Sequence, residues 1–371
     1  MRFPEFSGEW ERCKVKDFTK VVAGATPSTS NKEYWGGDIR WMNSGELNLK
    51  RVYEVQGRIT QLGYEKTSTK IIPPQSVLIG LAGQGKTRGT AAINYVELCT
   101  NQSIASILPS DKYYPEFLYQ NIESRYKELR DISSGDGGRG GLNLQMIYNL
   151  NIPYCSISEQ RKIGDFLCLL DQRIETQRKI IEKYESLIRG LYQFLFQQAK
   201  YDHFVSLGDI SQISNGNSDV KDASMYNDGS LYPFFDRSDE IKFLPEYLFD
   251  KEAIIYPGEG AEFYPRYYNG KFALHQRCYA VYDISTDFIP RYLYHYCKTQ
   301  NSYFVRNAVG STVASLRLDT FKRLKIPAIP THHQESLVMF LDKIEAKIEC
   351  NRTILKKYEE QKKYLLFTLF I

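Results

Sequence analysis

Apolar residues recur in alternating steps of four and three along two long stretches of the chain. The first series is Ile163, Leu167, Leu170, Ile174, Gln177, Ile181, Tyr184, Ile188, Leu191 and Leu195. The second series is Leu337, Leu341, Ile344, Ile348, Asn351, Leu355, Tyr358, Lys362, Leu365 and Leu369. This spacing is the heptad pattern of helices that pair along an apolar seam. It predicts two long helices, at 156–200 and 331–371.

The residues at the start of each stretch favour the beginning of a helix. Ser156 is followed three residues later by Glu159, and Thr331 is followed at the same distance by Gln334. A hydroxyl residue followed at this distance by a carboxylate or an amide is typical of a capping box. We therefore expect the side chains of Glu159 and Gln334 to cap the first turns of the two helices.

The two stretches are copies of one sequence. The segment that begins at Leu150 aligns without a gap with the segment that begins at Leu324, an offset of 324 − 150 = 174. Identical pairs at this offset include Ile152/Ile326, Pro153/Pro327, Gln160/Gln334, Phe166/Phe340, Ile174/Ile348, Tyr184/Tyr358 and Phe196/Phe370. Looser matches pair Gly24 with Gly216, Asn101-Gln102-Ser103 with His275-Gln276-Arg277, and Leu144 with Leu318. The chain therefore consists of two related halves.

Short β-type runs and helix-like runs alternate in the segments before each long helix. The sequence predicts a mixed α/β protein in four parts: globular domains at 1–155 and 201–330, each followed by a long helix, at 156–200 and 331–371. Helices related by the repeat would pair as an antiparallel coiled coil, with a pseudo-two-fold axis between the halves. Gln177 and Asn351 hold equivalent polar positions near the middle of each series. They either hydrogen-bond and set the register or face water.

Composition agrees with a globular protein and does not by itself identify a ligand. Hydrophobic residues make up 42%, charged residues make up 25%, and the formal net charge is +4. The seven Cys are scattered without paired spacing, which favours reduced thiols. The five His show no metal-ligand spacing, and no segment has the apolar length of a signal peptide or a membrane helix. We expect a cytoplasmic protein that has no metal and no cofactor.

The segment Gly24 to Asn48, GATPSTSNKEYWGGDIRWMNSGELN, resembles the opening of target-recognition domains in the specificity subunits of type I restriction-modification systems. The matching residues are Thr26-Pro27-Ser28, Tyr34-Trp35, Gly36-Gly37 and Trp41, with Ala25 where this family usually has Gly. CTNQSIASILP and IPYCSISEQRKIGDFL are similar to the family as well. The second half departs more, because it has no Trp-Gly-Gly, which leaves its DNA target open rather than its class.

The resemblance implies a subunit that has no catalytic activity of its own. Each of the two domains would read one half of a split site in double-stranded DNA. The paired helices would set the length of the unread spacer and dock two modification (methyltransferase) subunits, often together with restriction (translocase-nuclease) subunits. An orphan or silent specificity cassette has the same fold and stays an alternative that only the neighbouring genes can separate. A purely structural coiled-coil linker would not explain two related mixed domains around the helices.

One segment satisfies a nucleotide-binding pattern. Gly80 to Thr87 reads Gly-Leu-Ala-Gly-Gln-Gly-Lys-Thr, in which Lys86 would hold phosphates. This motif requires a helix after the threonine, because the helix N-terminus faces the phosphate. The residues after Thr87 favour another strand instead. An NTPase therefore stays a minor alternative, which predicts nucleotide binding that Lys86→Ala abolishes.

Contacts to DNA are expected from Lys and Arg on phosphates and from Arg, Asn, Gln, Ser and Thr on base edges. In the first domain the candidates are Lys86, Thr87, Arg88, Asn101, Gln102 and Arg139. In the second domain they are Arg237, Tyr264, Arg266, Tyr268, Gln276, Arg277, Ser315 and Arg317. For each of these residues, an ordinary solvated surface group is the alternative.

Overall fold

The computed structural model describes residues 2–83, 87–133, 141–198 and 201–370. It divides into two compact units, which we call unit 1 (Met1–Arg178 with Ile354–Ile371) and unit 2 (Lys179–Thr353). Each unit therefore contains one globular part together with segments of both long helices. Lys86 and Arg139, two of the predicted DNA contacts, lie outside the described residues. Within the described ranges, no helix combines the length and the apolar content needed to cross a bilayer.

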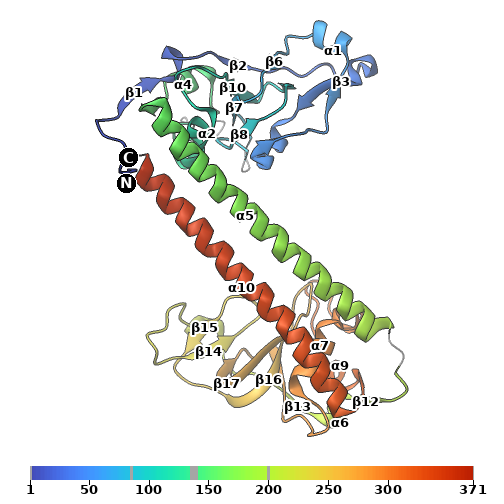
Figure 1. Cartoon of the computed structure of the whole chain (residues 1–371). Helices are drawn as coiled ribbons and strands as arrows, with labels where there is room; N and C mark the ends of the chain where they lie inside the picture. The colour runs from blue at the N-terminus through green and yellow to red at the C-terminus, as the bar shows by residue number, and fades with distance from the viewer. Residues whose placement is uncertain (1, 84–86, 134–140, 199–200, 371) are drawn as a thin grey trace. The chain divides into compact units, whose positions relative to one another are not determined.

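Both predicted long helices are present (Figure 1). Helix α5 spans Ile157–Tyr192 and continues into a π-helical turn at Gln193–Gln198. Helix α10 spans Thr331–Leu369. Most of the seam positions are buried, because apolar side chains at the heptad spacing all lie on one face of a helix.

The two helices lie side by side within each unit. In unit 1 the first part of α5 packs along the last part of α10, where Leu170 shares one hydrophobic core with Leu365. In unit 2 the last part of α5 packs along the first part of α10, where Ile188 shares a core with Leu341 and Ile344. The helices therefore run antiparallel in both units, as predicted.

Ion pairs flank the apolar seam in each unit. Arg178 of α5 lies 2.5 Å from Glu359 of α10 in unit 1, and Arg352 of α10 lies 2.7 Å from Glu185 of α5 in unit 2. All four side chains are partly exposed, so each pair contributes at most about 1 kcal/mol and serves alignment more than stability.

The predicted register contact joins residues of different units. Gln177 is buried in unit 1, and Asn351 is half-buried in unit 2, where its amide donates to the carbonyl of Lys347 (2.6 Å). The mutual hydrogen bond of Gln177 and Asn351 stays a prediction.

The globular parts are built on sheets with the same strand order. In unit 1 the order is β2 (Val21–Ala23), β10 (Ile104–Ile107), β7 (Val77–Gly80), β8 (Ala91–Asn94) and β4 (Arg51–Val52). In unit 2 it is β13 (Gln212–Asn215), β18 (Cys278–Tyr282), β16 (Phe249–Pro257), β17 (Arg266–Leu274), β14 (Tyr232–Phe235) and β15 (Lys242–Leu244). In both sheets the first four strands pair antiparallel, and the fifth strand pairs parallel to the fourth. The repeat in the sequence is therefore a repeat in topology.

Equivalent small elements connect the sheets to the long helices. β1 (Glu11–Lys14) pairs with β11 (Asn151–Tyr154), and β12 (Phe204–Ser206) pairs with β19 (Lys325–Pro327). The remaining equivalent helices are listed by pair: the turn Val15–Asp17 and α6 (Leu207–Ile210), α2 (Pro115–Ser124) and α7 (Pro290–Lys298), α4 (Leu144–Tyr148) and α9 (Leu318–Lys322). Further helices are α1 (Gln61–Glu65), α3 (Tyr126–Ile132) and α8 (Asn301–Asn307).

Unit 1 carries a second sheet, which explains the Tyr-Trp-Gly-Gly motif. Its strands are β5 (Arg58–Ile59), β3 (Trp35–Met42), β9 (Leu98–Thr100) and β6 (Ile71–Ile72). Gly36 has φ +82°, and a Cβ on Gly37 would lie 2.6 Å from the Ile59 carbonyl oxygen. Side chains at these positions would strain the irregular pairing of β3 with β5. Among its described residues unit 2 has no such sheet, and its main sheet continues with β15.

The predicted capping box of Ser156 and Glu159 is wrong in its second half, and that of Thr331 and Gln334 is wrong in both halves. Ser156 does accept from the backbone N–H of Glu159 (3.3 Å), but the Glu159 carboxylate pairs with Arg2 at 2.7 Å. Helix α10 already begins at Thr331, and the backbone N–H of Gln334 donates to the Pro330 carbonyl (3.2 Å). Local spacing predicted the caps, but contacts from other segments use these side chains.

A pair of equivalent glutamines instead ties each long helix to its globular part. Gln160 and Gln334 are fully buried. Gln160 accepts from the N–H of Tyr114, just before α2, at 2.8 Å, and Gln334 accepts from the N–H of Ile289, just before α7, at 2.8 Å. Each glutamine amide also donates to two backbone carbonyls: Lys112 and Cys155 for Gln160, Asp287 and Ile329 for Gln334.

Replacing either glutamine by leucine is expected to destabilise its own unit by about 2–4 kcal/mol, because buried backbone groups lose their partners. All three Trp of the chain (Trp10, Trp35 and Trp41) belong to unit 1. Gln160→Leu should therefore shift the urea midpoint of Trp fluorescence. Gln334→Leu should leave the Trp fluorescence midpoint unchanged and should shift only the part of the far-UV circular dichroism transition that comes from unit 2. Equal shifts of Trp fluorescence in both variants would contradict this expectation.

Candidate nucleic-acid interface

The predicted match between Asn101-Gln102-Ser103 and His275-Gln276-Arg277 is confirmed as one local structure that occurs twice. In unit 1, Asn101 accepts from the N–H of Ser103 through its side chain (3.1 Å) and from the N–H of Ile104 through its carbonyl (3.3 Å). In unit 2, His275 accepts from the N–H of Arg277 through Nδ1 (3.2 Å) and from the N–H of Cys278 through its carbonyl (2.8 Å). Each turn directly precedes a central strand, β10 or β18, so the sheet holds its backbone.

Two equivalent glycines let a second segment pass close to each turn. A Cβ on Gly24 would lie 1.9 Å from the Thr100 carbonyl oxygen, and a Cβ on Gly216 would lie 1.9 Å from that of Leu274. Only glycine permits this approach of two backbones. It places Thr26 beside the first turn, where its hydroxyl donates to the side-chain oxygen of Gln102 (2.5 Å).

The loop between β7 and β8 leaves the same end of the unit 1 sheet. The N–H of Leu81 donates to the Ser103 carbonyl (2.8 Å), and the Leu81 carbonyl accepts from Leu142 (2.9 Å). Thr87 and Arg88, two predicted contacts, are half-buried in this loop. The chain then enters strand β8, which pairs with β7 as a hairpin. The expected strand after Thr87 is confirmed, so the helix that a phosphate-binding loop requires is replaced by a strand.

Four of the predicted contacts gather at the corresponding end of unit 2. The Leu316 N–H donates to the Gly258 carbonyl (2.8 Å), which brings Ser315 and Arg317 beside the turn that holds Gln276 and Arg277. Gln276, Arg277 and Arg317 are exposed. A flat guanidinium and an amide at this end have the donor and acceptor pattern that base edges require.

Arg277 already has a carboxylate partner, which sequence reasoning missed. Its guanidinium lies 2.9 Å and 3.0 Å from the two carboxylate oxygens of Glu259, and the Ser315 hydroxyl lies 3.5 Å from the same carboxylate. The Arg277 side chain is nevertheless 63% exposed, whereas that of Glu259 is 20% exposed. Glu259 thus holds the Arg277 guanidinium while most of that side chain stays accessible.

The remaining predicted residues of unit 2 occupy different surroundings. The Arg266 guanidinium donates to the carbonyls of Asp236 and Ser238 and lies over the Phe235 ring, so it supports the loop that carries the exposed Arg237. Burial lowers the pKa of Arg266. The Tyr268 ring packs against Phe235 and Phe272. Tyr264 is exposed and lines a separate groove of about 1160 Å³.

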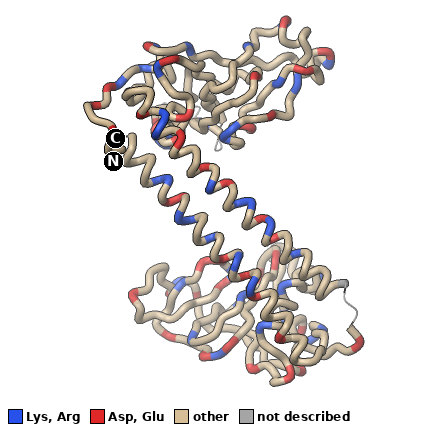
Figure 2. Tube along the Cα trace, viewed as in Figure 1, with Lys and Arg blue, Asp and Glu red and all other residues tan. Residues whose placement is uncertain are grey.

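Charge is distributed over the whole chain rather than gathered on one element. Figure 2 shows Lys and Arg on both globular parts and along both long helices, interspersed with Asp and Glu. Attraction of a polyanion therefore depends on exposed cations such as Arg237, Arg277 and Arg317, and not on the net charge of +4.

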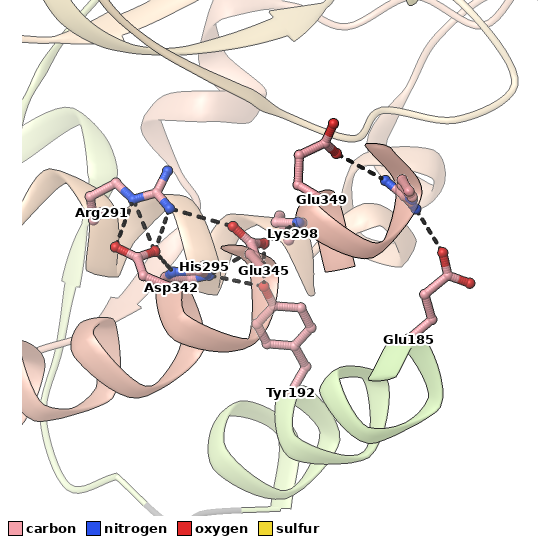
Figure 3. A network of polar contacts seen from close by, with 9 residues as sticks. Glu185, Tyr192, Arg291, His295, Lys298, Asp342, Glu345 and Glu349 are labelled. Carbon is pink, nitrogen blue, oxygen red and sulfur yellow. Dashed lines mark hydrogen bonds and ion pairs between the residues drawn. The ribbon is translucent and has the colours of Figure 1, made fainter. Parts of the chain in front are cut away.

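Sequence reasoning also missed a charge cluster in unit 2, in which His295 is buried and the charged members are partly exposed (Figure 3). Arg291 of α7 pairs with Asp342 of α10, and Lys298 of α7 lies 2.5 Å from Glu345 of α10. Between them, His295 Nε2 lies 2.8 Å from Asp342. Arg291, His295 and Lys298 recur at helical spacing, so a basic face of α7 was the signal in the sequence.

Three members of this cluster offer atoms of the kinds that metals bind. Ligand atoms of His295, Asp342 and Glu345 lie within 4.8 Å of one another. Both carboxylates, however, already receive Arg291 and Lys298. The arrangement therefore fits an internal network of ion pairs better than a metal centre.

Acidification is expected to destabilise unit 2 before unit 1. Burial lowers the pKa of His295 below its ordinary value of 6.5, although Glu345 and Asp342 act against this. The unfolded chain then binds more protons than the folded chain near pH 6, so stability falls as the pH drops through about 6.5. Lowering the pH from 7.5 to 5.5 should reduce the urea midpoint measured by far-UV circular dichroism, which reports on both units. The midpoint measured by Trp fluorescence, which reports on unit 1, should fall less.

The matched control for this pH effect is His295→Gln, which copies Gln120 at the equivalent position of α2 in unit 1. This variant should lose most of the difference between the two pH values. A variant that keeps the full pH dependence would assign it to other groups.

Comparisons with known proteins agree with the repeated architecture. A family model described as the type I restriction modification DNA specificity domain matches residues 7–185 and 201–360. The chain is 31% identical over 250 residues to the type I restriction enzyme MjaIX specificity subunit of Methanocaldococcus jannaschii, covering 61% of this chain and 57% of that protein. It is 25% identical over 203 residues to the EcoR124I/EcoR124II specificity subunit of Escherichia coli, covering 51% and 50%. The alignments thus span about half the length of these relatives.

Solved structures share the fold at low sequence identity. The S subunit of a type I restriction-modification system from M. genitalium superposes with a TM-score of 0.71 at 16% identity, covering 98% of this chain and 96% of that chain. A structure described in terms of complex assembly and conformational transition of the type I R-M system gives a TM-score of 0.56 at 14% identity, with 97% of each chain covered.

Proposed function

The chain belongs to the type I restriction-modification DNA specificity family, and from this premise we propose that it is a DNA-reading subunit with no catalytic activity of its own. The single observation that carries the proposal is the turn that occurs twice, once at the end of each sheet, with the same hydrogen bonds and the same glycine contact. Two equivalent rigid turns suit a protein that reads two half-sites, because a pinned backbone holds side chains against base edges.

We propose that the domains 1–155 and 201–330 each read one half of a bipartite site in double-stranded DNA. The helices at 156–200 and 331–371 would set the unread spacer. The proposed contacts are Lys86, Thr87, Arg88, Asn101, Gln102, Arg139, Arg237, Tyr264, Arg266, Tyr268, Gln276, Arg277, Ser315 and Arg317. Among them the two turns and the Arg277 side chain are the strongest candidates for contact with base edges.

We further propose that two modification subunits dock on the chain, one on each unit, with restriction subunits joining the complex, and that this complex works in the cytoplasm. Large apolar side chains stay exposed on the long helices of both units, and exposed apolar surface often marks a protein interface. In unit 1 they are Phe166, Leu169, Tyr364 and Phe367; in unit 2 they are Leu187, Phe194, Met339 and Phe340.

Adenine methylation mapped across the genome tests the proposal. Cells that carry this gene with its neighbouring modification subunit should show a split motif of two short half-sites. Cells in which only this gene is deleted should lose the motif while other methylation stays. A genome without a gene-dependent motif would contradict an active DNA-reading subunit and would favour the silent-cassette alternative.

A further inference from the structure

Unit 1 contains a charge cluster of its own, in which Glu116 is buried and the other members are half-buried. We call it cluster 1: Arg51, Glu116, Glu123, Asp171 and Lys362. Arg51 lies 2.7 Å from Glu116 and 2.9 Å from Asp171. Lys362 lies 2.6 Å from Asp171 and 2.7 Å from Glu123. The Lys362 side chain is only 13% exposed, although it stands at a heptad position where the pattern expects an apolar residue. The lysine therefore replaces seam packing with two ion pairs.

The cluster in unit 2, which we call cluster 2, consists of Arg291, His295, Lys298, Asp342 and Glu345 (Figure 3). Its cations come from α7 and its carboxylates come from α10. Tyr192 of α5 completes it, with its hydroxyl 2.9 Å from His295 Nδ1 and 3.1 Å from Glu345. Both clusters thus lie where the short helix of the globular part meets the long helices.

The repeat makes the members of the two clusters comparable one by one. On the long helices the offset of 174 pairs Asp171 with Glu345 and Lys362 with Ile188 (362 − 174 = 188). On the short helices, the bonds from Gln160 to Tyr114 and from Gln334 to Ile289 set an offset of 289 − 114 = 175. That offset pairs Glu116 with Arg291 and Glu123 with Lys298.

The short helices therefore carry opposite charges at equivalent places. α2 presents Glu116 and Glu123 to the long helices, and α7 presents Arg291 and Lys298. The equivalent positions of the long helices differ in the opposite sense. Lys362 places a cation in the seam of unit 1, whereas Ile188 keeps the seam of unit 2 apolar. Ile188 is 7% exposed and borders the same groove as Arg291 and Lys298.

Exchanging the helix segments between the units would leave shielded charges with fewer partners. An isoleucine in place of Lys362 would leave Glu123 with only the partly exposed Lys50, at 3.3 Å, and Asp171 with only Arg51, at 2.9 Å. A lysine in place of Ile188 would bring a third cation beside Arg291 and Lys298. A buried charge that loses its partner costs far more than the intact pair contributes.

We propose that each unit selects its own segment of the long helices by the sign of the charges that its short helix presents to them. Unit 1 accepts a helix that carries a cation at position 362, and unit 2 accepts a helix that is apolar at position 188. A helix from a second copy or from a related chain can replace the last part of α10 on unit 1 only if it brings that cation. This selection depends on the clusters alone and not on the proposed function.

The pKa shifts of Asp171 and Lys362 agree with an ion pair between them in unit 1. Burial by itself would raise the pKa of Asp171, but Lys362 and Arg51 hold that pKa below its usual value. Burial would likewise lower the pKa of Lys362, but Glu123 and Asp171 raise it. The ion pair between Asp171 and Lys362 therefore favours the charged form of both side chains.

The test measures amide hydrogen exchange of α2 and α7 in the full-length chain. Lys362→Met should speed exchange of α2 by roughly 100-fold or more and leave α7 within a few-fold, whereas Ile188→Lys should do the reverse. The variant that combines Ile188→Lys with Lys298→Glu gives unit 2 the charges of cluster 1, two cations and three carboxylates, because Arg291, Asp342 and Glu345 stay in place. It should recover α7 protection to within about 10-fold of the parent chain.

A second rescue variant, in unit 1, tests the proposal in case the new side chains in unit 2 pack poorly. Lys362→Met together with Glu123→Gln and Asp171→Asn removes the lysine and both of its carboxylate partners and leaves Arg51 paired with Glu116. This variant should restore most of the protection of α2. Normal α2 exchange in Lys362→Met alone would overturn the proposal. Failure of both rescues would overturn it as well, because the loss would then come from packing and not from charge.

Discussion

Inserting three heptads into each long helix is expected to move the two half-sites apart by about nine base pairs. Twenty-one residues at about 1.5 Å each add about 32 Å to a helix. DNA rises about 3.4 Å per base pair, so this length corresponds to about nine base pairs. That is close to a full turn of about 10 base pairs, so the two half-sites would keep nearly their original rotation relative to each other around the duplex axis. Whole heptads also keep the apolar seam in phase.

The measurement compares the affinity of the complex for its natural site with its affinity for sites of longer spacer. Binding to the natural site should fall by roughly 1000-fold or more, towards non-specific binding, because only one half-site can be read at a time. A site lengthened by nine or ten base pairs should recover most of the affinity. As a control, one inserted heptad adds about three base pairs and rotates the second half-site by about a third of a turn, so no spacer should fully restore binding. An unchanged spacer in the longer variant would contradict the idea that the helices set it.

Substituting Gln102 is expected to change the reading of one half-site, and substituting Gln276 the reading of the other. Both side chains are exposed on turns whose backbones are held by the same hydrogen bonds. A glutamine that forms two hydrogen bonds to a base contributes about 1–3 kcal/mol of discrimination. Gln102→Ala and Gln276→Ala should therefore each lower discrimination at one base pair by roughly 10- to 100-fold.

The measurement is selection from a library of DNA sites in which both half-sites are randomised. The matched control is Gln172→Ala, a change at an exposed glutamine of α5 outside both domains, which should leave both half-sites unchanged. The dependence of affinity on salt should change little in all three variants, because an uncharged side chain releases no counterions. If Gln102→Ala relaxed the half-site that Gln276→Ala also relaxes, the two turns would not serve separate half-sites.

The heptad series illustrates what a pattern can predict without coordinates. Spacing by four and three puts side chains on one face of a helix whatever surrounds it, so α5 and α10 followed directly from the residues. Lys362 is the informative exception, because it stands at a heptad position but is charged rather than apolar. The charge that it meets comes from Glu123 and Asp171, which lie far away in the sequence.

The failed capping boxes show the opposite limit. Ser156 with Glu159 and Thr331 with Gln334 satisfy a local rule, and the rule assumes that no other segment competes for the side chains. In the folded chain, Arg2 takes the Glu159 carboxylate and Ile289 takes the Gln334 amide oxygen. The partner of each side chain is therefore set by the packing of the globular part, which brings distant segments to the start of the helix.

The DNA-contact candidates divide in the same way. The alignment of Gln102 with Gln276 required only the repeat, and the two turns share one local structure. Glu259 could not be assigned as the partner of Arg277 from the sequence, nor could the buried surroundings of Arg266 and Tyr268. These depend on which strands are neighbours, and strand order is set by contacts between residues far apart in the chain.

The sequence by itself determined the two long helices, the duplication of the chain, the strand after Thr87 and the family resemblance, because each of these rests on periodicity or on the order of residues. The tertiary structure alone decided the shared strand order, the buried glutamine contacts of Gln160 and Gln334, and the opposite polarity of the two charge clusters. The physical reason is that ion pairs and buried hydrogen bonds act over a few ångströms in space, and a linear sequence does not contain those distances until the chain has folded.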